Sequence, residues 1–139
     1  MRRARRDRRD RGVRGPLTLR TALVPADSPP RPTPAALFDA RVARAAARLR
    51  RHVGAGLDGV DVGVEEVPVL PEDWEQEVPM SAHLPARGRR PARIVVYRMP
   101  VGARARGRAE TVSLVLDLLV EEAADLLGRD PDELDPRLR

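Results

Sequence analysis

The chain has 139 residues, enough for one domain, and a formal net charge of +5 at pH 7. It contains no cysteine, which excludes a disulfide, a thiolate metal site and a thiol nucleophile. The basic charge is local: residues 1–20 hold nine Arg against two acids (+7), whereas the other 119 residues hold 17 Arg against 19 acids (−2). The positive net charge therefore does not mark the whole chain as a nucleic-acid binder.

Residues 1–33 are rich in arginine and proline, and we expect them to form a disordered basic tail. The only apolar stretch of the tail, residues 17–24, contains Arg20 and is too short for a signal-peptide core or a membrane span. We therefore expect a cytoplasmic protein. The tail can contact nucleic acid or another anion without specificity, although no aromatic residue is interleaved to stack on bases.

Residues 34–53 have the spacing of an amphipathic helix. Thr33 followed by Pro34 is a typical helix start, because Thr caps an exposed amide and proline lacks the amide that the first turn leaves unpaired. Gly54 is the expected end. The predicted buried face consists of Phe38, Val42, Ala45, Leu49 and Val53.

Three short strands are expected after this helix. Residues 60–64 alternate valine with polar residues or glycine, which is typical of a half-buried strand, and a second strand is expected at 81–84. Residues 92–98 contain a contiguous apolar run that suits a central strand, and Pro100 is expected to stop it. The polar segment 70–80, around Trp74, is predicted to be a loop or lid.

A long helix from about residue 108 to Gly128 is the predicted core, because its apolar residues cover most of the circumference. A basic connector containing Arg104 and Arg106 leads into it, and residues 130–134 should add one closing helical turn. These elements predict an α+β domain over residues 34–139, in which two main helices pack on one face of a mixed sheet of about three strands.

One line of carboxylates follows the long helix: Asp117, Glu121 and Asp125 recur at i, i+4 and i+8, while Glu122 is expected to point elsewhere. Stacked like charges repel unless water, arginines or a cation compensate them. The sequence leaves three environments open: a solvated acidic edge, a salt-bridge network with arginines of residues 98–106, and a metal site.

The segment Glu121-Glu122-Ala123-Ala124-Asp125-Leu126-Leu127-Gly128 resembles the HExxHxxG motif of zincin metallopeptidases, with acids at both histidine positions. Residues 94–100 are similar to a strand of the form IxxYRxP in the small bacterial zincin-like metallopeptidases, and Glu77-Val78-Pro79 resembles the loop before it. Leu134 matches a leucine six residues after the glycine. The chain is thus similar to this family, and specifically to a branch whose metal motif has degenerated.

The resemblance implies a zinc enzyme, but its site residues carry over poorly. The ligand positions fall on Glu121, Asp125 and Pro131, and Pro131 has no ligand atom. Only the general-base position is kept, as Glu122. Carboxylates bring negative charge and favour hard cations, so a bound water would be less acidic than on a histidine-ligated zinc. We therefore expect no zinc or other cofactor, and an idle Glu122.

Three functions follow as hypotheses. The first is an inactive or very weak peptidase that binds a peptide or protein segment by strand addition. The second is a weak divalent-metal hydrolase with Glu121 and Asp125 as ligands, His83 as a further candidate and Glu122 as base. The third is nucleic-acid or anion binding through residues 1–33.

Overall fold

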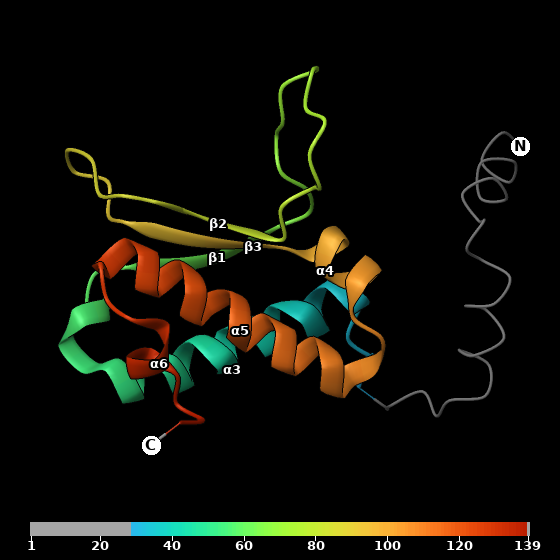
Figure 1. Ribbon diagram of the computed structural model, residues 1–139. Helices are drawn as coiled ribbons and strands as arrows, with labels where there is room; N and C mark the ends of the chain where they lie inside the picture. The colour runs from blue at the N-terminus through green and yellow to red at the C-terminus, as the bar shows by residue number, and fades with distance from the viewer. Residues whose placement is uncertain (1–28, 139) are drawn as a thin grey trace, which may run out of the picture. The chain divides into compact units, whose positions relative to one another are not determined.

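The computed structural model describes residues 29–138, and residues 32–139 form one compact unit (Figure 1). Most of the predicted tail, residues 1–28, lies outside the described residues. The elements in chain order are α3 (Pro34–Val53), the 3₁₀ helix η2 (Gly54–Leu57), β1 (Asp61–Glu65), β2 (Ser81–Leu84), β3 (Arg93–Tyr97), α4 (Arg98–Arg104), α5 (Gly107–Leu127) and α6 (Pro131–Leu134).

The three predicted strands form one mixed sheet in the order β1-β3-β2. β1 pairs with β3 in parallel, with Val62 opposite Ile94, and β2 pairs with β3 in antiparallel, with His83 also opposite Ile94. β3 is central, as its apolar run predicts, and β2 is at an edge. Residues opposite one another share a face, so Val62, Ile94 and His83 lie on the same side of the sheet.

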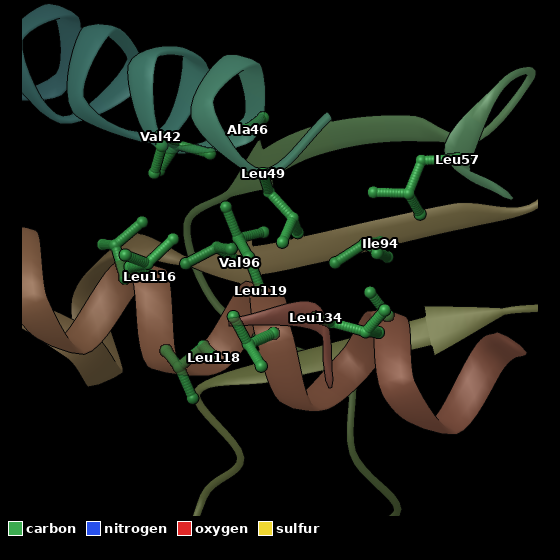
Figure 2. Close-up of a cluster of buried hydrophobic side chains, with 14 of the residues drawn as sticks. Val42, Ala46, Leu49, Leu57, Ile94, Val96, Leu116, Leu118, Leu119 and Leu134 are labelled. Carbon is green, nitrogen blue, oxygen red and sulfur yellow. The ribbon is translucent and has the colours of Figure 1, made fainter. Parts of the chain in front are cut away.

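Helices α3 and α5 pack against each other and against one face of this sheet (Figure 1). Figure 2 shows the core between these layers, where Leu49 of α3, Ile94 and Val96 of β3 and Leu119 of α5 converge. Leu134 of α6 closes one end and is fully buried. The α+β class and the packing of both main helices on a three-stranded mixed sheet are confirmed.

The ends of α3 follow the predicted chemistry. The Thr33 hydroxyl accepts a hydrogen bond from the Ala36 amide at 3.0 Å, and Pro34 occupies the first turn. The amide of Gly54 donates to the carbonyl of Arg50 and closes the helix. All the residues expected on the inner face are buried except Val53, which is half-buried.

The prediction of a basic connector before α5 is partly wrong, because residues Arg98–Arg104 form a short helix, α4. Pro100 lies in its first turn, where a proline costs no hydrogen bond, so it does not act as a stop. Val101 is fully buried and anchors the helix. Arg98 binds the Glu66 carboxylate through two nitrogens, at 2.9 and 2.5 Å, and thereby lowers the pKa of Glu66.

Helix α5 begins and ends within a residue of its predicted limits. Gly128 terminates it in the left-handed conformation (φ 65°), where a residue with a Cβ would be strained. After α6, Arg137 returns to α5 and binds Asp117 at 2.6 Å and Asp135 at 2.7 Å. Within residues 29–138, no helix has the length and apolar character needed to cross a bilayer.

The Asp135–Arg137 pair should make stability depend on acid pH. Hydrogen bonds from Arg137 lower the pKa of Asp135 from 3.8 to about 2, so its contribution is present above the unfolded value and is lost as pH falls through about 2. The Asp135→Asn variant should lose about 1–2 kcal/mol at neutral pH and about none at the acid limit. Urea unfolding of the unaltered protein and the variant, from neutral to acid pH, measures this loss of stability. A difference that stays constant with pH would contradict the prediction.

Candidate functional site

A carboxylate of α5 and two side chains of the edge strand form a hydrogen-bonded cluster between the helix and the sheet. The Ser81 hydroxyl donates to Glu122 Oε2 at 2.5 Å, and His83 Nδ1 shares a hydrogen bond with Glu122 Oε1 at 2.6 Å. Each oxygen of Glu122 therefore has a hydrogen-bond partner from β2.

The sequence of β2 explains this convergence. Alternate residues of a strand share a face, and Ser81 and His83 lie opposite Val96 and Ile94, whose side chains belong to the core. Both polar side chains therefore point toward the helix layer, at the margin of the sheet. Glu122 meets them from α5, one turn after the buried Leu118 and Leu119.

Partial burial makes these contacts strong. Only 15% of the Glu122 side chain is exposed, against 31% for His83. A carboxylate removed this far from water needs hydrogen-bond donors, and Ser81 and His83 supply them. Its charge reaches Tyr97, whose pKa is raised by burial first and then by Glu65 and Glu122.

The predicted acidic line divides into different environments. Asp117 binds Arg137, whereas Glu121 is exposed. The expectation that Glu122 points away from the line is wrong with respect to Asp125 only: one ligand atom each of Glu122, Asp125 and His83 lie within 4.8 Å of one another. Glu121, the other predicted carboxylate ligand, does not belong to this group.

The arginines considered as partners of this line bind elsewhere. Arg98 pairs with Glu66, Arg104 lies 3.9 Å from Glu77, and the backbone amide of Arg106 donates to Glu110. In residues 29–138, neither Glu121 nor Asp125 forms an ion pair, so the network from residues 98–106 is absent there. His83, Glu122 and Asp125 can instead hold a metal ion, and their donor set is one imidazole with two carboxylates.

Pro131, the third ligand position implied by the motif, begins α6. It follows Asp130, whose side chain caps the Asp132 amide, while Glu133 completes the capping box. This residue therefore has a structural role at a helix start and offers no side-chain donor.

The backbone of β2 also has a defined orientation. The Tyr97 amide donates to the Met80 carbonyl at 2.9 Å, which makes residues 80 and 97 a hydrogen-bonded pair of the antiparallel ladder. Such pairs alternate, so residue 82 also bonds to β3, and the amide and carbonyl of Ser81 and His83 face the opposite way. Ser81 and His83 thus direct their side chains to Glu122 and their main chains to the free edge.

From the sequence, His83 is a candidate site residue and Ser81 is not. The signal available was their spacing: two polar residues two apart in a predicted strand share a face. What no local pattern indicates is that this face meets Glu122, 39 residues away from His83.

Comparison with known proteins adds one match. The family model described as zincin-like metallopeptidase matches residues 57–138, which are more than half of the chain and include all three strands, α5 and α6. No curated protein matches the chain. The family match, in agreement with the α+β fold and the residues quoted for the resemblance, establishes that the chain belongs to the zincin-like metallopeptidase family.

Proposed function

We propose that this protein is a catalytically inactive member of its family that binds an extended peptide or protein segment along the free edge of β2. The observation that carries the proposal is the double hydrogen bonding of Glu122 by Ser81 and His83. A general base must accept a proton from a water positioned beside it. Here both carboxylate oxygens already have partners.

The metal positions implied by the motif support the loss of activity. Glu121 and Asp125 are exposed carboxylates and Pro131 supplies no donor atom, so the three positions do not fit a catalytic zinc. A catalytic zinc held by neutral imidazoles would lower the pKa of the water molecule bound to it. Without neutral imidazole ligands at these positions, we expect no zinc and no hydrolysis.

Peptide binding is supported by the edge. The sheet order leaves one side of β2 without a partner strand among residues 29–138, and the main-chain groups of Ser81 and His83 face that side. An added strand would gain backbone hydrogen bonds there, which is the usual basis of recognition by strand addition. Glu122, at the general-base position implied by the motif, instead holds the strand in place through Ser81 and His83.

The binding proposal can be tested with two substitutions at one residue. His83→Pro removes both the imidazole and the outward amide, whereas His83→Ala removes the imidazole alone, and an edge strand tolerates proline where the amide faces outward. The probe is a dye-labelled, end-blocked peptide of alternating Val and Thr residues, which favours the extended conformation. We expect His83→Pro to weaken binding about tenfold relative to His83→Ala, the value of one backbone hydrogen bond.

Fluorescence anisotropy measures both affinities, and circular dichroism checks that the variants fold. Equal affinities of the two variants would show that the edge is not where the peptide binds. Cleavage of the probe by the unaltered protein, detected by mass spectrometry, would overturn the claim of inactivity.

A weak metal-dependent hydrolase is the second candidate, and the grouping of His83, Glu122 and Asp125 within 4.8 Å favours it. Its oxygen-rich donors suit Mn²⁺ or Mg²⁺ better than a thiolate-seeking ion. Glu122→Gln removes a ligand, whereas Glu121→Gln changes the adjacent exposed carboxylate and is the matched control. Elemental analysis after purification without chelator should find no stoichiometric metal; metal lost only in Glu122→Gln would favour this candidate instead.

Nucleic-acid or anion binding through residues 1–33 and a cytoplasmic location stay predictions from the sequence. Deletion of the tail tests the first. If the deletion leaves nucleic-acid binding and its salt dependence unchanged, the tail is not the binding element.

A further inference from the structure

A basic groove lies between α3 and α5, away from the Glu122 site. Its volume is about 820 Å³. Six arginines line it: Arg41, Arg44, Arg48, Arg51, Arg108 and Arg137. Between them the lining is aliphatic, with Ala45, Val112 and Leu116, and Val112 is 43% exposed. The groove thus combines a high positive charge with an apolar floor.

Most of these arginines form no ion pair in the described part of the chain. Of the six arginines, only Arg137 forms an ion pair there, with Asp117 and Asp135. Neighbouring guanidinium groups repel one another, so an acidic partner that enters the groove would relieve the repulsion. The floor carries no aromatic ring for base stacking and favours an apolar side chain over a nucleic-acid base.

The chain itself carries a segment of complementary chemistry. Residues 65–77, from the end of β1 into the loop before β2, contain six acids and no basic residue. Three of the acids, Glu65, Glu66 and Glu77, lie near arginines of their own chain. The other three, Glu72, Asp73 and Glu75, flank Trp74 and form no ion pair within residues 29–138.

This loop also exposes large apolar side chains. Figure 1 shows it projecting from the sheet, and Val69 is 98% exposed and Trp74 38% exposed. A tryptophan between carboxylates is the type of residue that dominates an interface when it enters an apolar pocket surrounded by charge. The basic tail, with its charge of +7 over residues 1–20, would be repelled by the groove and does not suit it.

We infer that the groove receives the acidic loop of a second copy of this chain. Trp74 of one protomer packs on the floor around Val112, and Glu72, Asp73 and Glu75 pair with the arginines of α3. Two copies that exchange loops reciprocally form a closed dimer, in which the groove of each protomer is filled by its partner. The contact is independent of peptide binding at β2, because neither the groove nor the tip of the loop includes Ser81 or His83.

Charge exchange tests the pairing. Arg44→Glu with Arg48→Glu reverses the groove, and Glu72→Arg with Glu75→Arg reverses the loop. Sedimentation equilibrium of the full-length chain at low ionic strength should give a dimer that dissociates as salt is added. We expect each double variant alone to raise the dimer dissociation constant at least tenfold, and an equimolar mixture of the two to restore association, because each reversed groove then meets an oppositely charged loop.

The only tryptophan gives a second readout. Fluorescence emission of Trp74 should shift to shorter wavelength on association and should stay at the monomer value in either double variant. Arg87→Glu with Arg89→Glu, on the exposed turn between β2 and β3, is the matched charge control and should leave the dimer unchanged. A monomer at every concentration, or association that the mixture does not restore, would overturn the inference. So would groove-dependent binding of a short RNA with no self-association.

Discussion

Replacing Leu119 with alanine should lower the free energy of unfolding by about 3–4 kcal/mol, near the centre of the range for a fully enclosed leucine. Leu119 has no exposed surface and lies where α3, α5 and the sheet meet (Figure 2). The loss combines the transfer free energy of the removed carbons with the cost of a cavity that close-packed neighbours cannot fill. A domain of this size has a total stability of about 5–15 kcal/mol, so the effect is large.

Urea unfolding followed by circular dichroism measures this change, with an unchanged dependence on urea if the native state stays compact. Val69→Ala is the control, because Val69 is 98% exposed and its truncation should change stability by less than about 0.5 kcal/mol. Similar losses for the two variants would contradict the assignment of the core to the contact of the two helices with the sheet.

Placing imidazoles at two positions of α5 should produce the other large effect. The double variant Glu121→His with Asp125→His should bind about one zinc per chain, because two histidines at i and i+4 share a helix face and suit zinc. His83 adds a third imidazole, since its ring lies near the Asp125 carboxylate. The variant site would have three neutral imidazoles, whereas Glu121, Asp125 and His83 of the unaltered chain together carry two negative charges.

Elemental analysis and competition with a chromogenic chelator give the zinc content and affinity of both proteins. Glu121→Gln with Asp125→Asn, which removes the same charges without adding imidazoles, is the matched control and should bind no zinc. We expect the histidine variant to remain a poor peptidase, because Glu122 keeps its bonds to Ser81 and His83. Equal zinc affinity in the unaltered chain would contradict the proposal that its metal positions are inactive.

The sequence predicted the helices and strands where one physical signal dominated. Thr33 and Pro34 indicate the start of α3, Gly128 indicates the end of α5, and the run from Ile94 to Val96 predicts a covered strand. These signals are local, because each depends on a cap, a backbone conformation or the period of apolar residues.

The prediction failed where tertiary contacts decide. α4 is short and has little periodicity, and it is held by the burial of Val101 and the bond between Arg98 and Glu66. The sequence also does not show the grouping of His83, Glu122 and Asp125, for a related reason. The helical period places Asp117, Glu121 and Asp125 in line, but it does not show that β2 passes beside Glu122, and that passage selects Glu122 and Asp125 over Glu121.

The side chains and the main chain of β2 face different parts of the structure, and this difference determines what a mutation in the strand can change. Ser81 and His83 direct their side chains toward α5, and only their main-chain atoms face the free edge of β2. Any segment that aligns with the strand would therefore encounter the same atoms in almost every variant, proline excepted. Substitutions at these two residues would change the strength of the contact between β2 and α5. They would leave the main-chain atoms at the free edge nearly unchanged.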